Sequence, residues 1–309
     1  MFIEILGSAA GGGFPQWNCN CPNCRRLREG TLAGKPRSQT QVAVGHTSNS
    51  WFLLNASPDL RTQIERTPAL HPQGKGRHSP IGGVLVTGAD VDQIAGLLAL
   101  REWHRFCLYC APSIRRILQH DNSIFHMLER VANQLSWHEI TPETSFPLLD
   151  PTGTNSGIAC TVFPLASRYP AYVLGRCSFD LKPDEAQLGV ILEAPSGGRL
   201  AYLPAVADIS PQLLERLALV DLMLFDGTFW SDDELIQVEG CGSSAREMGH
   251  TPVSGANGSL EKLGGLRRPR KVFIHLNNTN PILDESSTAY RQVRQAGWEV
   301  AQDGDRFEL

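Results

Sequence analysis

The sequence contains no long apolar run and carries little net charge, and each absence excludes a class of protein. No stretch approaches the about 18 consecutive apolar residues that a membrane-spanning helix requires. A net charge of −4 over 309 residues provides no basic surface of the kind that binds nucleic acid. We therefore expect a protein that does not insert into membranes and does not have nucleic acid as a partner.

The features of a signal peptide are also missing from the start of the chain. The first residues, MFIEILGSAAGGG, have no basic segment before their apolar part, so they predict a first β-strand and not a secretion signal. We accordingly expect a cytoplasmic protein. In that reducing compartment, the eight cysteines are expected to bind metal or to lie buried as thiols, not to form disulfides.

Internal repeats and low-complexity linkers are absent, and the pattern indicates a single domain over residues 1–309. Short apolar runs predict β-strands, and amphipathic segments between some of them predict helices. Because strands and helices do not alternate strictly, an α+β sandwich of mixed sheets with helices on the outer faces is favoured. The strands are expected at 2–6, 41–45, 51–55, 83–87, 106–110, 159–163, 189–194, 199–203, 222–226, 272–276 and 298–302. The helices are expected at 58–66, 93–103, 112–119, 123–135, 210–219, 258–264 and 287–296.

Three of the predicted strands end in side chains that can bind metal. Asp90 and Asp92 follow one strand, Asp226 ends another, and His275 lies near the end of a third. Ligands in α/β sheets gather beyond the carboxyl ends of strands, so these residues predict a metal site. Carboxylates with one imidazole suit iron, manganese or magnesium at least as well as zinc.

Each of these residues also has a structural explanation. Asp92 could cap a helix that starts at Gln93, which would account for an Asp at this place. Asp226 could be a turn residue, and His275 could be a buried, hydrogen-bonded histidine. Only the repetition of such residues at several strand ends favours the metal site.

The cysteines near the start of the chain give a sharper signal. The motif CNCPNC places Cys19, Cys21 and Cys24 within six residues. Three thiolates at this spacing fill three corners of a tetrahedral zinc site, which predicts a structural zinc loop at 17–25. Three free thiols on a loop would instead be exposed to oxidation.

The other cysteines and one further histidine carry weaker signals. Cys107 and Cys110 lie in an apolar strand pattern and are expected to be two buried thiols that point to opposite faces. The Gly- and Ser-rich segment 240–255 predicts a loop that contains His250. Such a loop is a candidate wall or lid of a site, although a surface loop with an incidental histidine explains it equally well.

The turn after the strand at 83–87 resembles the signature of the metallo-β-lactamase superfamily, Thr-His-x-His-x-Asp-His-x-x-Gly. The matching residues are Thr87, Asp92 and Gly96, and the three histidine positions hold Gly88, Asp90 and Gln93. Blocks along nearly the whole chain also resemble one family of that superfamily, the B proteins of coenzyme PQQ (pyrroloquinoline quinone) synthesis. These blocks are SAAGGGFPQWNCNCPNC, NASPDLRTQI, FDGTFWSDDE, REMGH and HLNNTNPILDE.

The resemblance implies an αββα sandwich and a cytosolic homodimer that acts in PQQ synthesis, with a PQQ precursor, a small molecule or a dipeptide, as its partner. It also implies a structural Zn²⁺ on the Cys-x-Cys-x-x-Cys motif. A phosphodiesterase of the same subclass supplies the fourth zinc ligand as a histidine at the position that holds Asn278 here. The fourth ligand is therefore Asn278, a more distant histidine or water.

The resemblance further implies one of two functions. The first is an Fe²⁺- and O₂-dependent hydroxylase that acts on the tyrosine ring of a peptide-derived PQQ precursor. The second is a carrier that assists the transport of PQQ or its precursor to the periplasm. Asp92 and His275 match two of the expected iron ligands, whereas Gln93 stands where a histidine is usual and offers only a neutral oxygen.

The remaining polar residues complete the hydroxylase hypothesis. Asp90 and Gln93 would be auxiliary metal ligands, and Asp226 and His250 would be catalytic polar groups. His250 could alternatively supply a second imidazole to the metal. The loss of the signature histidines favours the carrier, because a decayed site can persist as a binding pocket. A two-metal hydrolase is the least favoured function, since such a centre needs more imidazole and bridging-carboxylate ligands than this turn supplies.

Overall fold

The structure, a computed structural model, describes residues 1–47, 50–175, 180–240 and 242–309. Cys177 and Cys241 lie outside these ranges. The described residues form two compact units, each built from separate stretches of the chain. Unit 1 comprises Met1–Leu6, Gln41–Gly198 and Gly304–Leu309, and unit 2 comprises Gly7–Thr40 and Arg199–Asp303. Each unit is described by itself below, and the expected single domain stays a prediction.

Unit 1 is built around one of the two seven-stranded sheets, in the order β14-β1-β2-β3-β4-β5-β6. The strands are β1 (Phe2–Gly7), β2 (Gln41–Thr47), β3 (Ser50–Leu54), β4 (Ile81–Leu85), β5 (Phe106–Cys110), β6 (Leu135–Glu139) and β14 (Arg306–Glu308). The pairs β14–β1 and β2–β3 are antiparallel, and the pairs from β3 to β6 are parallel. The sheet is therefore mixed, as predicted.

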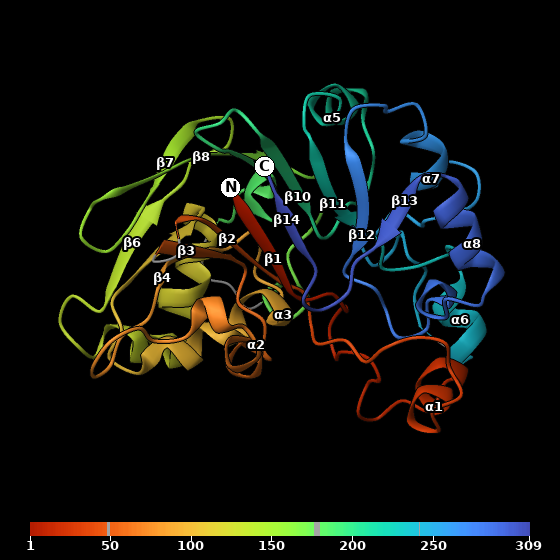
Figure 1. Cartoon of the computed structure of the whole chain (residues 1–309), viewed down its shortest axis with the longest axis horizontal. Coiled ribbons are helices and arrows are strands. Elements are labelled where there is room, and N and C mark those ends of the chain that lie inside the picture. Colours follow the sequence, from red (N-terminus) through yellow and green to blue (C-terminus); the bar gives the residue numbers. More distant parts are fainter. Residues whose placement is uncertain (48–49, 176–179, 241) are drawn as a thin grey trace. The chain divides into compact units, whose positions relative to one another are not determined.

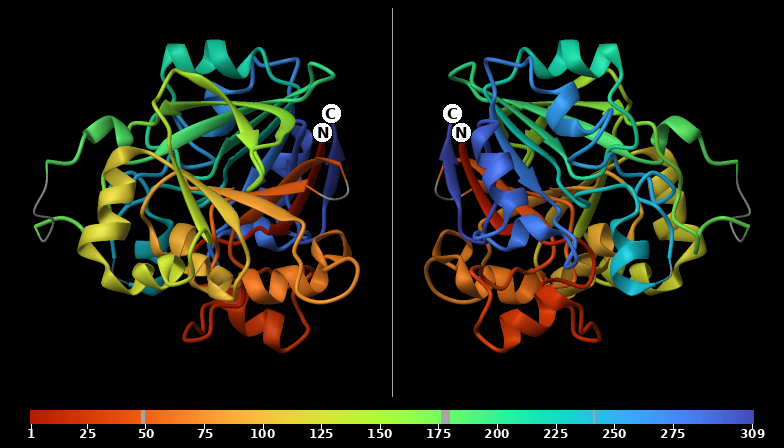
Figure 2. Two further views of the ribbon diagram at one scale, coloured as in Figure 1. Left: turned by 90° about the vertical axis from the view of Figure 1, so that its left-hand side faces the viewer. Right: turned by 90° about the vertical axis from the view of Figure 1, so that its right-hand side faces the viewer.

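The two ends of the chain meet in unit 1. β14 pairs with β1 in the register Phe2 to Glu308, and the amide of Leu309 donates to the carbonyl of Met1. Figure 1 and both views of Figure 2 accordingly show the two termini side by side. This pairing uses the backbone of the last residues, which places the end of the chain at the edge of the sheet.

Unit 1 also contains β7 (Ser145–Leu149), β8 (Asn155–Pro164) and β9 (Leu188–Glu193), which pair antiparallel. Its helical segments are short. They are α2 (Leu60–Arg66), η1 (Pro68–Leu70), α3 (Val91–Ile94), η2 (Ala95–Arg101), α4 (Pro112–Arg116), η3 (Ile117–Asp121), η4 (Ser123–Glu129) and η5 (Pro183–Glu185). Of these, η1, η2, η4 and η5 are 3-10 helices and η3 is a π-helix.

Unit 2 contains four parallel strands, β10 (Arg199–Leu203), β11 (Leu222–Asp226), β12 (Arg270–Ile274) and β13 (Trp298–Val300). Every residue of β11 is buried, as are all but the first residues of β10 and β12. Strands covered on both faces need such continuous apolar sequence. The helices are α1 (Pro22–Arg28), α5 (Pro211–Leu217), α6 (Glu234–Glu239), α7 (Ser259–Lys262), η6 (Pro281–Leu283) and α8 (Thr288–Gln295). Figure 1 shows α8 beside β13, which it contacts.

Most predicted elements are present, but several bounds were wrong. The predicted helix at 123–135 is a shorter 3-10 helix, and its last residue, Leu135, begins β6. The strands β6, β7 and β14 were missed. β6 and β14 contain only two and one large apolar residues, and β7 contains a proline, which is unusual within a strand. The helix expected from 58 begins at Leu60, and Ser57 accepts a hydrogen bond from the amide of Asp59 ahead of it. In the described ranges, no helix has both the length and the apolarity needed to cross a bilayer.

Gly96, which matches the superfamily signature, is required by a close backbone contact. Its amide donates to the carbonyl of Ala56 at 2.8 Å. A Cβ at this position would lie 2.1 Å from the carbonyl oxygen of Ser57, and backbone atoms cannot move aside as a flexible side chain can. A glycine at 96 therefore allows the helix that follows the 86–93 turn to pack against residues 56 and 57.

We predict that Gly96→Ala lowers the free energy of unfolding by about 3 kcal/mol, because the new methyl group overpacks a fixed backbone contact. Urea denaturation measures the change. Gly265→Ala is the matched control, because a Cβ there meets nothing within 4 Å. The control should change the free energy of unfolding by less than about 0.5 kcal/mol. Equal unfolding midpoints for the two variants would contradict the close contact.

Candidate metal centres

Asp226 is a fully buried carboxylate at the end of β11, within unit 2. Its Oδ1 accepts from the amide of Thr228 at 3.0 Å and from the Thr228 hydroxyl at 2.6 Å. Its Oδ2 accepts from the amide of Val206 and from His250 Nδ1, both at 2.8 Å. A carboxylate offers about four acceptor sites, so these donors together satisfy it. The charge can therefore be buried in a fixed orientation.

His250 and His275 lie against this carboxylate with their rings stacked. The ring centroids are 5.5 Å apart and the rings are inclined by 21°. His250 comes from the 240–255 loop, and His275 follows β12 with a φ of 62°. A non-glycine residue in this left-handed region is uncommon, and such residues cluster at functional sites.

The hydroxyl of Thr228 determines which ring nitrogens carry protons. Its oxygen lies 3.1 Å from His250 Nδ1 and 2.8 Å from His275 Nδ1. The hydroxyl has one proton, which it donates to Asp226, so its oxygen accepts from the rings. Without a cation, both histidines are then protonated at Nδ1, so an ion that binds these nitrogens together with Asp226 has to replace those protons.

Two opposing effects act on the pKa of Asp226. Burial by itself would raise it. The hydrogen bonds from His250 and the Thr228 hydroxyl, with the positive charge that His250 or His275 carries when protonated, outweigh burial and hold the pKa below its ordinary value. Asp226 is therefore an anion at neutral pH, able to attract a cation.

Asp226, His250 and His275 together form a candidate metal-binding group. Each is buried, and one ligand atom from each lies within 4.8 Å of the others. The sequence placed Asp226 and His275 at strand ends, and the structure shows that these strands, β11 and β12, are parallel neighbours. His250 was predicted on a loop, as a catalytic polar group or as a second imidazole ligand, and its approach to Asp226 needs the folded course of that loop.

The turn at 86–93 lies in unit 1. Helix α3 starts at Val91, so the alternative that Asp92 caps a helix starting at Gln93 is wrong. Asp90 holds the N-cap position without a capping hydrogen bond from its side chain, and Asp92 lies in the first turn. Both are half-buried, whereas Gln93 is buried. That Asp90, Asp92 and Gln93 bind a metal together with His275 stays a prediction.

The first histidine position of the superfamily signature is closed in this chain. A Cβ on Gly88 would lie 2.4 Å from Oε1 of Gln93 and 2.4 Å from Oε1 of Gln187. The two glutamines are joined by a hydrogen bond of 3.1 Å from Gln93 Nε2 to Gln187 Oε1. Any side chain at position 88 would have to displace this pair.

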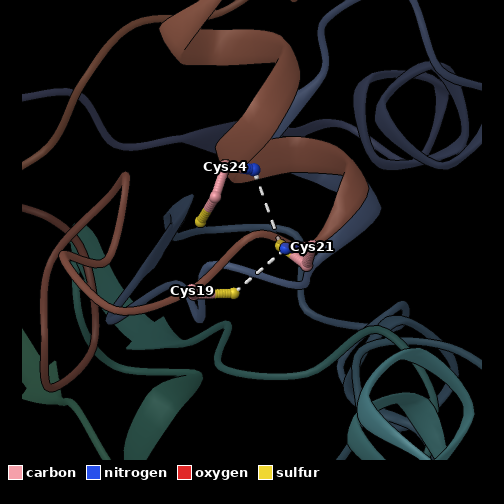
Figure 3. Close-up of side chains that lie close together, drawn as sticks. All are labelled: Cys19, Cys21 and Cys24. Carbon is pink, nitrogen blue, oxygen red and sulfur yellow. Dashed lines mark hydrogen bonds between the residues drawn. The ribbon is translucent and has the colours of Figure 1, made fainter.

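The cysteine motif also forms a candidate metal group, in unit 2. One sulfur from each of Cys19, Cys21 and Cys24 lies within 4.8 Å of the others. Cys21 precedes α1 and Cys24 lies in its first turn, where the sulfur of Cys21 accepts from the amide of Cys24. Figure 3 shows these three side chains close together, with the sulfur of Cys19 accepting from the amide of Cys21.

Asn278 lies beside all three sulfurs. Its Nδ2 is 3.1 Å from Cys19 Sγ, 3.6 Å from Cys21 Sγ and 3.5 Å from Cys24 Sγ. Turning the amide over would present its oxygen to the same position, since the two ends have the same shape. Three thiolates and one further ligand at a common point fit the tetrahedral shell of Zn²⁺.

Burial keeps Cys19 and Cys24 as neutral thiols in the absence of a cation. Burial raises the pKa of Cys19 to about 12, and the pKa of Cys24 is raised by burial and by the charge of Cys21. A bound zinc ion reverses this effect, because thiolates coordinate it directly. Cys107, Cys110 and Cys160 are also buried free thiols, which was expected for Cys107 and Cys110. Burial raises the pKa of Cys107 to about 11.

Comparison with known proteins identifies the family. Residues 50–276 match the beta-lactamase superfamily domain. A coenzyme PQQ synthesis protein B from Azotobacter vinelandii is 44% identical over 311 residues, which cover 100% of both chains. One from Methylobacterium nodulans is 42% identical and covers 99% of both. The chain belongs to the coenzyme PQQ synthesis protein B family.

Solved structures agree with this family and with its fold. The crystal structure of Zn²⁺-bound PqqB from Methylobacterium extorquens has a TM-score of 0.91 to this chain, with 39% identity and full coverage of both chains. A diphosphatase of the PhnP family has a TM-score of 0.67 at 19% identity, covering 100% of this chain and 97% of its own, and shares the fold alone. The predicted metallo-β-lactamase-like fold of two mixed sheets with helices is confirmed.

We predict that Cys24→Ser removes about one equivalent of zinc from the purified protein, because a serine oxygen is a poor substitute for a thiolate ligand. Zinc is measured by metal analysis after gel filtration. Cys160→Ala is the control, since Cys160 is a buried thiol that belongs to neither metal group. Equal zinc content in both variants would exclude the cysteine site.

Glu234 is a buried carboxyl group hydrogen-bonded to residues near both metal groups. We expect it to make the stability of the protein depend on pH. It accepts from the amide of Trp230 and from the hydroxyl of Thr279, which follows Asn278. Burial raises its pKa to about 7, although these hydrogen bonds oppose the rise. A raised pKa means that its contribution to stability is complete below the unfolded value and is lost as the pH rises through the folded value.

We predict that Glu234→Gln loses this pH dependence. Relative to the wild type, the variant should gain stability between about pH 4.5 and 8, by at most about 3 kcal/mol at 1.4 kcal/mol per pKa unit. Urea unfolding at a series of pH values measures the difference. Parallel stability curves for the two proteins would contradict the raised pKa.

Proposed function

We propose that this protein acts in PQQ synthesis as an iron- and O₂-dependent hydroxylase of the tyrosine ring in a peptide-derived PQQ precursor. The observation that carries the proposal is the buried group of Asp226, His250 and His275. Two imidazoles and one carboxylate are the donor set of non-haem Fe²⁺ oxygenases. The names of the relatives, coenzyme PQQ synthesis protein B, support the pathway.

The residues of the group fit such an ion. Asp226 supplies a negative charge, and one nitrogen of each histidine lies within 4.8 Å of a carboxylate oxygen, close enough for the three residues to share an ion. When bound, iron supplies the one-electron chemistry by which O₂ reacts with an organic ring. Other divalent cations that prefer the same nitrogen and oxygen ligands could bind to the same three residues.

The surrounding residues hold the group in place and exclude water. Thr228 holds the carboxylate through both its amide and its hydroxyl, while the same hydroxyl contacts both rings. Phe229 packs edge-on against the His250 ring, with centroids 5.9 Å apart. Such fixed dipoles, rather than mobile water, then surround a reacting substrate.

The cysteine group has a separate role in this proposal. Cys19, Cys21 and Cys24, with Asn278, would hold a structural zinc ion. A closed set of sulfur ligands leaves no position for substrate, which separates it from the histidine group. The protein would then contain two kinds of metal site.

A carrier of PQQ or its precursor is the second candidate function. The residue at position 88 favours it, because Gly88 stands in place of the first histidine of the superfamily signature and the ends of Gln93 and Gln187 fill the space beside it. The same observation disfavours a two-metal hydrolase, which needs that imidazole. Tight binding of PQQ by the iron-free protein, without conversion of a precursor, would support the carrier.

We predict that the protein incorporates oxygen from ¹⁸O₂ into a tyrosine-containing dipeptide after anaerobic loading with Fe²⁺. His275→Ala should lose the iron of this group and at least about 100-fold of the hydroxylation rate, because it removes a ligand, yet keep its zinc. Mass spectrometry of the product and metal analysis of the protein measure both effects. His138→Ala, in unit 1, is a control that should retain iron and activity.

Two outcomes would overturn parts of the proposal. Iron content that is unchanged in His275→Ala would exclude this residue as a ligand. Iron binding without any labelled product, beside an active relative assayed in parallel, would exclude the hydroxylase and favour the carrier.

A further inference from the structure

Four buried polar side chains in unit 1 form a continuous chain of hydrogen bonds. Asn55 follows β3, Thr87 follows β4, Gln187 precedes β9 and Gln93 lies in α3. Each is 5% exposed or less. A buried polar network that is fully connected fixes one arrangement of its side chains. At one end of this network stands Gln93, the residue that occupies a histidine position of the superfamily signature.

A backbone amide sets the direction of the whole chain of bonds. The amide of Thr87 donates to Asn55 Oδ1 at 2.8 Å, so Asn55 must present its oxygen to Thr87. The Thr87 hydroxyl lies 3.0 Å from the same oxygen, and it can only donate to it. Its own oxygen then accepts from Gln187 Nε2 at 3.1 Å. Gln187 therefore turns Oε1 towards Gln93, which donates to it from Nε2 at 3.1 Å.

The orientation of the Gln93 amide follows from this direction. Because its Nε2 donates to Gln187, the other end of the amide, Oε1, points away from Gln187 and is left to accept a hydrogen bond or bind a ligand. Among the described residues, this buried oxygen accepts no hydrogen bond. A buried acceptor left without a donor costs free energy, which an ion or another ligand would recover.

Other oxygens gather at the same place. The bare face of Gly88 meets Oε1 of Gln93 and Oε1 of Gln187, each 2.4 Å from the position of a Cβ, and the carbonyl oxygen of Ala186 at 3.2 Å. Two amide oxygens and one carbonyl oxygen are hard, neutral donors of the type that Mg²⁺, Mn²⁺ and Ca²⁺ prefer. A glycine at 88 is what allows these oxygens to approach one another.

We propose that Asn55, Thr87 and Gln187 form a relay that positions the amide of Gln93, so that Gln93 offers its oxygen to a hard divalent cation. Gln187 is the positioning residue that contacts Gln93, and Thr87 and Asn55 set its orientation. The relay does not rest on the proposed iron group of Asp226, His250 and His275; it requires only that a divalent cation binds beside Gln93 in unit 1. It goes further in explaining how a glutamine can occupy a histidine position.

The test measures Mn²⁺ binding to the zinc-loaded, full-length protein by electron paramagnetic resonance. Gln93→Leu defines the site that depends on this oxygen. Gln187→Leu, which frees the Gln93 amide to turn, should weaken Mn²⁺ binding at that site by about 10-fold or more. Gln187→Glu keeps an acceptor for Gln93 Nε2 and adds a negative charge beside the ion, so it should restore Mn²⁺ affinity to at least that of the wild type.

A double variant and a control separate positioning from loss of structure. Because Gln187 acts through Gln93, the variant with both leucines should bind Mn²⁺ no more weakly than Gln93→Leu alone. Gln134→Leu is the matched control, since Gln134 is also buried, donates through Nε2 and has an Oε1 with no partner among the described residues. It should leave Mn²⁺ binding unchanged. Thr87→Val breaks the relay one step further away and should resemble Gln187→Leu.

The results also distinguish this inference from the proposed function. Unchanged Mn²⁺ affinity in both Gln93→Leu and Gln187→Leu would overturn the relay. So would a failure of Gln187→Glu to restore binding although it melts at the temperature of the wild type. Oxygen incorporation and its loss in His275→Ala test the hydroxylase independently, so either conclusion can fail while the other stands.

Discussion

The burial of the Asp226 carboxylate is the constraint on which the candidate iron site depends. An ionised carboxylate without partners cannot be buried at an acceptable cost in free energy. Four donors satisfy it here, two from Thr228, one from Val206 and one from His250. These donors come from the segments that follow β10 and β11 and from the 240–255 loop, so the charge fixes the positions of all three segments. The proton positions on both histidines then follow from the single hydroxyl of Thr228.

One short segment after β12 serves both metal groups of unit 2. His275 contributes to the histidine group, and Asn278 lies beside the three cysteine sulfurs. Asn280 lies in the same segment, and its side chain donates to the carbonyls of Gly227 and Thr228, next to the histidine group. A zinc ion on the cysteines would therefore stabilise the segment that also carries a ligand of the proposed iron site, which is a structural reason for a zinc loop in such a protein.

The proposed relay would allow the signature turn of unit 1 to bind a metal although its histidine positions hold other residues. Loss of the histidines at positions 88 and 93 removes two nitrogen donors, but the Gln93–Gln187 pair fills the space with oxygen donors. The amide oxygen is a neutral ligand, so affinity has to come from carboxylates and from fixed orientation. The buried relay from Asn55 to Gln187 provides that orientation without adding charge.

The sequence by itself determined the fold class, the strand ends that carry Asp226 and His275, and the cysteine spacing, because apolar periodicity and short-range spacing are local properties. It did not determine β6, β7 and β14, which contain few large apolar residues or a proline and are ordered by their neighbours. Only the tertiary structure brought His250 to Asp226, Asn278 to the cysteines and Gln187 to Gln93, across 24, 254 to 259 and 94 residues respectively. Such contacts depend on how loops return to the sheet, which no local pattern encodes.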